Sequence, residues 1–153
     1  MNTSTDRIER KIVLNATRAR VWRALTDVGE FNSWFGVKLQ GKHFTAGVKF
    51  TGAVTNPGYE HIVMELTIEK VEPEKLLSWR WHPGAIDPKV DYSGEPTSLV
   101  EFLLQDAVGG TLLTVVESGI DKIPVARRLQ VFLMNSEGWG IQMQNIEKYV
   151  AAS

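Results

Sequence analysis

The sequence contains no cysteine. It can therefore form no disulfide, no thiolate metal site and no cysteine nucleophile, and this absence fits a reducing compartment. It also has no block of like charge, because 17 Lys and Arg residues balance 18 Asp and Glu residues. We therefore expect no nucleic-acid partner. No segment has the apolar length of a signal peptide or a membrane span, which predicts a cytoplasmic protein without membrane insertion.

Motifs for metal ions and cofactors are also missing. His43, His61 and His82 lie far apart, and no pair has the spacing of a zinc site. The segment 138–140, Gly-Trp-Gly, lacks the third glycine and the preceding strand of a dinucleotide motif, and no serine occupies a nucleophile elbow. We therefore expect no metal, no cofactor and no acyl-transfer nucleophile.

The last thirty residues carry the clearest pattern. After Pro124, apolar residues recur at steps of three and four, which predicts one long amphipathic helix running almost to Ser153 with a buried stripe. The stripe consists of Val125, Leu129, Phe132, Ser136, Trp139, Met143, Ile146 and Val150. Trp139 lies between Gly138 and Gly140, and a glycine inside a helix costs about 1 kcal/mol relative to alanine. Two interpretations stay open: close packing against a sheet, or a helix that closes over a cavity and needs space beside Trp139.

The rest of the chain predicts an α+β fold. Alternation predicts a strand over 8–14, and Thr17 is a suitable N-cap for a short helix over 18–27 that ends at Gly29, before a further helical turn over 30–35. Runs of β-branched and aromatic residues between turn signals predict strands over 37–39, 48–54, 62–71, 76–82, 98–105 and 111–117. We expect a flexible N-terminus over 1–7 and a single domain over 8–153. The long loop over 83–96 is a candidate lid or cavity rim.

Several short motifs resemble one known family. They are Asn15-Ala16, the run from Val21 to Asp27, Trp34-Phe35, Gly110-Thr111, the run from Val116 to Ile120, and the run from Asn135 to Trp139. In this order they resemble the bacterial proteins similar to activator of Hsp90 ATPase homologue 1, within the START-like (SRPBCC) superfamily. Where such proteins usually carry proline after Asn-Ala, this chain has Thr17, which alters only how the helix starts.

The resemblance implies a helix-grip (START/Bet v 1-like) fold. In it, a curved antiparallel sheet of about seven strands wraps around a long C-terminal helix, with two short helices after the first strand and an apolar cavity between sheet and helix. The superfamily includes lipid carriers, hormone receptors, aromatase and cyclase components, and co-chaperones. The fold alone therefore does not choose a function.

The candidate cavity residues are mostly apolar, as ligand sites are. Ordinary core packing is the alternative for each of them, but buried tryptophans need partners for their N–H groups, and five tryptophans favour a partly polar cavity. The expected lining is Trp34, Trp79, Trp81, Phe102, Leu104, Val115, Glu117, Phe132, Ser136, Trp139 and Met143. Asn135, beside the stripe, is a further candidate hydrogen-bonding residue.

Glu117 is the central polar candidate. It is in step with Leu113 and Val115, so alternation predicts an inward carboxylate, which must be paired when buried. Its role stays open among a general base, an acceptor for a ligand hydroxyl, and a structural partner of Arg80 or of a tryptophan N–H. His82 ends the predicted strand that carries Arg80 and adjoins the long loop, either at the cavity mouth or as a solvated loop residue.

The candidate residues and the family resemblance together suggest three functions. The leading hypothesis is non-catalytic binding of a small hydrophobic or aromatic molecule in the cavity. The alternative is an enzyme of cyclase or hydrolase type that uses Glu117 with His82 or Arg80. An Hsp90-type co-chaperone comes third, from the family resemblance alone. The sequence leaves a homodimer open.

Overall fold

The computed structural model describes residues 6–152, and residues 1–5 of the expected flexible N-terminus lie outside that range. Its elements are β1 (Arg7–Leu14), α1 (Arg18–Thr26), α2 (Val28–Phe35), β2 (Lys49–Ala53), β3 (Val63–Glu72), β4 (Leu76–Trp81), β5 (Ser98–Ala107), β6 (Gly110–Ser118), a 3₁₀ turn (Ile120–Lys122) and α3 (Val125–Ala151). The described strands form one antiparallel sheet in the order β1-β6-β5-β4-β3-β2.

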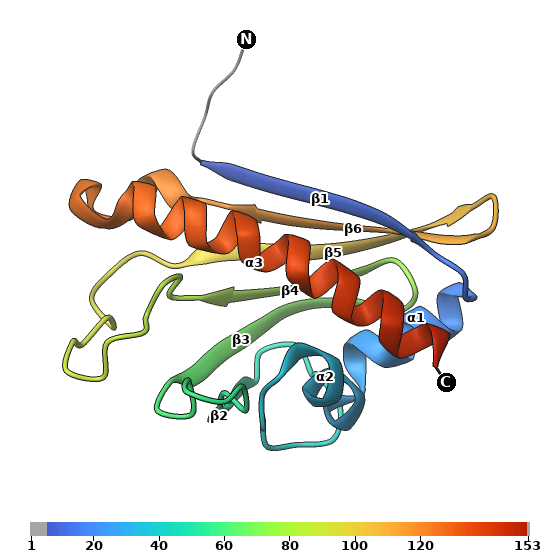
Figure 1. The fold of residues 1–153 in the computed structure, drawn as a ribbon, viewed down its shortest axis with the longest axis horizontal. Coiled ribbons are helices and arrows are strands. Elements are labelled where there is room, and N and C mark those ends of the chain that lie inside the picture. The colour runs from blue at the N-terminus through green and yellow to red at the C-terminus, as the bar shows by residue number, and fades with distance from the viewer. Residues whose placement is uncertain (1–5, 153) are drawn as a thin grey trace, which may run out of the picture.

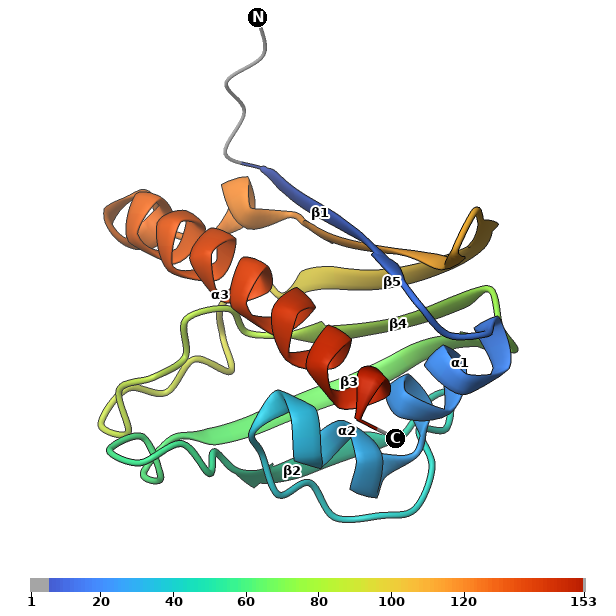
Figure 2. The same ribbon diagram turned by 45° about the vertical axis from the view of Figure 1, so that its right-hand side comes forward.

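The long helix α3 lies across one face of the curved sheet, as Figure 1 shows. The two short helices pack near the C-terminal end of α3, on the same side of the sheet (Figure 2). This arrangement confirms the expected α+β helix-grip architecture. Among the described residues, no helix is both long enough and apolar enough to cross a membrane.

The sheet has six strands where the sequence predicts about seven. The expected strand over 37–39 forms only an isolated bridge between Val37 and Val54. Its backbone still follows β2, since the Lys38 N–H donates to the Ala53 carbonyl at 2.9 Å and the Gln40 N–H to the Thr51 carbonyl at 3.2 Å. The approach is so close that a Cβ on Gly52 would lie 2.0 Å from the Lys38 oxygen. The segment therefore runs beside the sheet edge without the reciprocal bonds of a full ladder.

The two short helices meet at Asp27. Thr17 caps α1 as predicted, accepting from the Arg20 N–H at 3.1 Å. Asp27 then ends α1 and caps α2, because its carboxylate accepts from the Glu30 N–H at 3.0 Å. The expectation that Gly29 ends the first helix is therefore wrong, and Gly29 lies inside α2. An aspartate cap satisfies free helix N–H groups, so the second helix begins without a glycine break.

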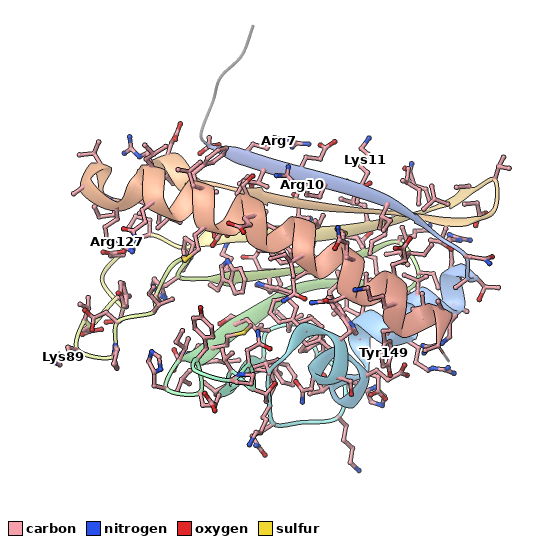
Figure 3. The ribbon with its side chains drawn as sticks, in the orientation of Figure 1. Arg7, Arg10, Lys11, Lys89, Arg127 and Tyr149 are labelled. Carbon is pink, nitrogen blue, oxygen red and sulfur yellow. The ribbon has the colours of Figure 1, made fainter. Side chains whose placement is uncertain are left out.

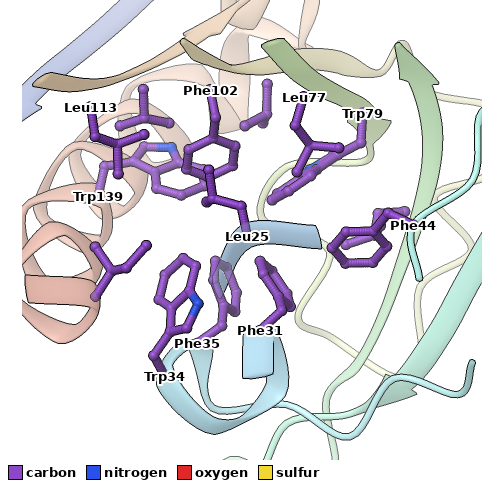
Figure 4. Packing of buried hydrophobic residues seen from close by; sticks show 14 of the residues in the cluster. Leu25, Phe31, Trp34, Phe35, Phe44, Leu77, Trp79, Phe102, Leu113 and Trp139 are labelled. Atoms are coloured by element: carbon purple, nitrogen blue, oxygen red, sulfur yellow. The ribbon is translucent and has the colours of Figure 1, made fainter. Parts of the chain in front are cut away.

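Aromatic side chains dominate the core, as Figure 4 shows. Trp79 is fully buried, with its ring 5.7 Å from Phe31, 5.2 Å from Phe102 and 6.4 Å from Trp139, measured between centroids. These edge-to-face and tilted contacts join α2, the sheet and α3. The space between α3 and the middle of the sheet is therefore filled by side chains.

The buried stripe of α3 is confirmed only in its second half. Trp139, Met143, Ile146 and Val150 are buried, but Val125 and Leu129 are 78% and 61% exposed. In the first half the buried apolar residue is Val131. This half packs on the 83–96 loop: a Cβ on Gly84 would lie 2.8 Å from Val131 Cγ2. The change of packing partner moves the buried face around the helix.

Candidate functional site

Glu117 lies on β6 and is fully buried, which confirms its predicted inward direction. Its Oε1 accepts from Asn135 Nδ2 at 3.0 Å and from Trp139 Nε1 at 2.9 Å. Its Oε2 accepts from Trp81 Nε1 at 2.8 Å and from Ser98 Oγ at 2.6 Å. The carboxylate therefore joins β4, β5, β6 and α3 at one point.

These four bonds use the whole accepting capacity of the carboxylate. A carboxylate has about four lone-pair sites, and each oxygen here accepts two hydrogen bonds. All four donors are neutral groups, so the charge is stabilised by oriented dipoles. No lone pair is left to take a proton from a substrate or to accept from a ligand. Glu117 is therefore suited to hold its four donor side chains in position.

Arg80 lies on the other face of the sheet. Its Nε is 2.8 Å from Glu69 Oε1, and both side chains are about 40% exposed. Side chains alternate along a strand, so Trp79 and Trp81 face inward and Arg80 faces outward. Of the partners left open for Glu117, Arg80 is therefore excluded, and the tryptophan N–H groups of Trp81 and Trp139 bond to it.

A groove of about 720 Å³ lies beside this cluster. One wall is the face of α3 that carries Met134, Asn135, Gly138 and Gln142, and the facing wall comes from residues 61–65, 82–88 and 90–93. Phe35 and Trp81 line it from α2 and β4. His82 also lines it, with its Nε2 3.0 Å from the Glu95 carbonyl oxygen. The charged side chains of the lining, at Lys49, Glu65, Asp87 and Asp91, are all at exposed positions, as is the imidazole of His61.

The structure brings one member of the expected cavity lining, Trp81, to the groove, with Glu117 and Trp139 bonded directly behind it. Ser136 points instead toward β1, where Arg10 donates to its hydroxyl and its carbonyl. Phe132 is half-buried against the core. The remaining members belong to the buried core: Trp34, Trp79, Phe102, Leu104, Val115 and Met143. Trp34 has the partner that its N–H requires, the Ala24 carbonyl at 2.8 Å.

Sequence reasoning missed Ser98, whereas space beside Trp139 is one of the two interpretations that the sequence leaves open for the glycines of α3. Ser98 is fully buried and in step with Val100 and Phe102, so the alternation that found Glu117 also indicates Ser98. A Cβ on Gly138 would meet no atom within 4 Å, and a Cβ on Gly140 would meet only Arg10 Nε, at 4.0 Å. Close packing therefore does not explain either glycine, and only Gly138 lines the groove.

The 83–96 loop is tied to α3 by Arg127. Its guanidinium pairs with the Glu95 carboxylate at 2.5 Å, donates to the Gly84 carbonyl at 3.4 Å, and lies 5.0 Å from the centre of the Tyr92 ring. Figure 3 shows Arg127 reaching from the helix toward this loop. The loop thus forms one wall of the groove and is held to α3 by these contacts. In the described part of the chain, no group of three His, Asp or Glu side chains is placed to hold a metal ion.

Comparison with known proteins agrees with this architecture. The family model described as "Activator of Hsp90 ATPase homolog 1-like protein" matches residues 15–151. No curated protein matches the sequence. Among solved structures, protein MLL2253 from Mesorhizobium loti is similar with a TM-score of 0.76 and 22% identity, over 96% of this chain and 98% of that one.

Two further structures have the same fold. Protein NE0264 from Nitrosomonas europaea aligns with a TM-score of 0.74 and 20% identity, over 99% of this chain and 98% of that one. The Aha1 dimer from Colwellia psychrerythraea, determined in solution, aligns with a TM-score of 0.69 and 15% identity, over 94% and 95%. Since the family model spans nearly the whole chain, the protein belongs to the activator of Hsp90 ATPase homolog 1-like family.

Proposed function

We propose that this protein binds a small, flat apolar or aromatic molecule in the groove between α3, β3 and the 83–96 loop, without catalysing a reaction. The groove volume of about 720 Å³ suits such a molecule. Its less exposed lining combines the aromatic rings of Phe35 and Trp81 with the amide side chains of Asn135 and Gln142. The exposed charged residues form its outer part.

Gly138 is the observation that carries this proposal. It lies in the middle of α3, where a glycine costs about 1 kcal/mol relative to alanine. A Cβ at this position would meet no atom within 4 Å, so packing does not require a glycine here. Asn135, Gln142 and Gly138 share the helix face that lines the groove. The absent side chain leaves open space in the groove that Trp81 also lines, which is what a bound ring needs.

The non-catalytic part of the proposal rests on Glu117. General acid–base chemistry needs a group within hydrogen-bond reach of the reacting atom with a free lone pair or proton. Glu117 already accepts four hydrogen bonds, and Arg80 is on the opposite face. His82 alone of the three catalytic candidates lines the groove.

Titration with Nile red, a flat neutral dye that fluoresces in apolar sites, tests the proposal. We expect saturable binding to the wild type and at least about tenfold weaker binding to Gly138→Leu, because leucine fills groove space that is open at Gly138. Gly140→Leu is the matched control, since Gly140 lies in the same helix but outside the groove lining. Equal affinity of the wild type and both variants would place any bound dye elsewhere and overturn the proposal.

We also propose that the chain forms a homodimer through the first half of α3. Val125, Leu129 and Leu133 recur at four-residue steps and are 78%, 61% and 58% exposed, so they form an apolar strip on one helix face. The Colwellia relative is described as a dimer. Light scattering coupled to size exclusion should give the mass of a dimer for the wild type and of a monomer for Leu129→Glu.

A further inference from the structure

The hydrogen-bonding polarity of the groove is fixed by the groups behind it. Asn135 bonds to Glu117, and a carboxylate only accepts, so the Asn135 NH₂ must face Glu117 and its Oδ1 must face away. Among the described residues, no donor bonds to this oxygen, and Asn135 lines the groove. Glu117 therefore holds Asn135 so that the groove receives an acceptor.

His82 is oriented by the same logic. Its Nε2 lies 3.0 Å from the backbone carbonyl oxygen of Glu95, which only accepts, so Nε2 carries the hydrogen. In the neutral imidazole Nδ1 is then the acceptor. No donor among the described residues bonds to it, and His82 also lines the groove. The bond to the Glu95 carbonyl therefore leaves His82 Nδ1 as a second acceptor.

The other amide of the inner groove, Gln142, is anchored on both sides, with one N–H and its oxygen engaged in hydrogen bonds. Gln142 donates through Nε2 to the Phe35 carbonyl at 3.0 Å, and its Oε1 accepts from Asn145 Nδ2 at 3.1 Å. The Trp81 N–H is used by Glu117, so its ring contributes an aromatic surface and no donor. The inner groove therefore offers two acceptors beside an aromatic ring.

We propose that the ligand is an uncharged aromatic compound bearing hydroxyl or N–H donors, which bond to Asn135 Oδ1 and His82 Nδ1 while its ring packs beside Trp81 and Gly138. This inference rests on the groove being the binding site, as proposed above. A ligand with acceptors alone displaces water from Asn135 and His82 and leaves these acceptors unpaired, which is unfavourable. A ligand anion has no donor to offer these two acceptors, and the lysine of the lining, Lys49, is at an exposed position.

A matched pair of compounds tests this. A naphthalenediol and its dimethyl ether share one ring system, but only the diol donates hydrogen bonds. The affinity of each compound is measured by ¹H–¹⁵N NMR titration at about pH 7.5, where the diol and an ordinary imidazole are both mainly neutral. We expect the wild type to bind the diol at least about tenfold more tightly, with the Trp81 indole resonance shifting. The ratio of the two affinities is the readout, because a general loss of stability acts on both compounds.

Three variants assign the preference. We expect Asn135→Leu and His82→Phe each to lower the ratio about fivefold, since each removes one acceptor and keeps similar bulk. Gln144→Leu is the matched control on α3, at an exposed position outside the groove lining, and should leave the ratio within about twofold of the wild type. If Asn135→Leu fails to fold, His82→Phe and the wild-type ratio still decide.

Different results overturn different proposals. Equal affinities for the diol and the ether in the wild type overturn the donor preference but leave groove binding intact. A preference that survives in both Asn135→Leu and His82→Phe overturns the assignment to these acceptors. If neither compound binds the wild type and Nile red also fails to bind, both the donor preference and the groove proposal fall.

Discussion

The indole of Trp139 donates to the carboxylate of Glu117 at 2.9 Å, joining the long helix to the last strand of the sheet. Trp81 donates to the other carboxylate oxygen at 2.8 Å. An indole N–H is a donor only and cannot reverse its role. With one indole on each oxygen, both side-chain atoms must accept, which the two oxygens of Glu117 can do and an amide cannot.

Replacing Glu117 with glutamine should therefore destabilise the protein despite the similar shape. The amide NH₂ must face one of the two indoles, which leaves two donors opposed in a buried site. We expect the free energy of unfolding to fall by about 2–4 kcal/mol, as measured by urea denaturation. Glu101→Gln, on the neighbouring strand β5 where Glu101 is half-buried, should change it by less than about 0.5 kcal/mol. Equal stabilities of the two variants would contradict this account of Glu117.

Replacing either of the two glycines of α3 should stabilise the protein, in contrast to Glu117→Gln. Gly138→Ala and Gly140→Ala should each raise the free energy of unfolding by about 0.5–1 kcal/mol, because alanine restricts the unfolded chain and a Cβ is accommodated at both positions. Urea denaturation checks the values, and the double variant should be close to additive. A destabilised Gly138→Ala would mean that the helix needs this glycine for packing, which would remove the main support for the groove proposal.

Much of this fold follows from local patterns in the sequence. Alternation predicted the inward side chain of Glu117, and turn residues located the strands within a few residues. The Thr17 cap also followed from its side chain. These features depend on neighbours along the chain, so they are readable without tertiary structure.

The groove between α3 and the 83–96 loop could not be predicted from sequence patterns, because it depends on how segments far apart in the sequence pack together. The stripe of α3 predicted burial of Leu129 and a cavity position for Ser136, but the first half of the helix packs on the 83–96 loop, and Arg10 from β1 binds Ser136. The interior that was expected to be a cavity is filled by Trp79 and Phe102. The periodicity of apolar residues in a helix does not predict that a loop distant in sequence will cover one end of the helix.

The Arg127 contacts predict a local effect on the 83–96 loop. Arg127→Met keeps the apolar stem but loses the bonds to Glu95 and Gly84. We expect amide hydrogen exchange over 84–95 to accelerate about fivefold or more, because these charge-assisted bonds oppose opening of the loop. Mass-spectrometric exchange measures this by segment. In the control Arg128→Met, which loses only bonds to the Ile123 carbonyl, exchange in the loop should stay unchanged. Acceleration in both variants would point to fraying of the helix end.

The last prediction concerns alkaline stability through Tyr149. Its hydroxyl donates to Glu30 Oε1 at 3.0 Å, connecting α3 to α2, and its position near the end of α3 is visible in Figure 3. Burial, and then the hydrogen bond to the Glu30 carboxylate, raise the pKa of Tyr149 above its ordinary value of 10.0. The unfolded chain therefore releases this proton at lower pH than the folded protein does. The stabilisation is fully present below about pH 10 and is lost as the pH rises through the folded-state pKa.

Urea denaturation between about pH 9 and about pH 11 tests this contribution. The free energy of unfolding of the wild type should fall more steeply with pH than that of Tyr149→Phe, which lacks the titrating group. Tyr59→Phe is the control, because Tyr59 is 57% exposed and should keep the wild-type slope. Other lysines and tyrosines titrate alike in all three proteins, so the difference in slope isolates Tyr149. Parallel curves for the wild type and Tyr149→Phe would show that the bond to Glu30 does not couple this phenol to folding.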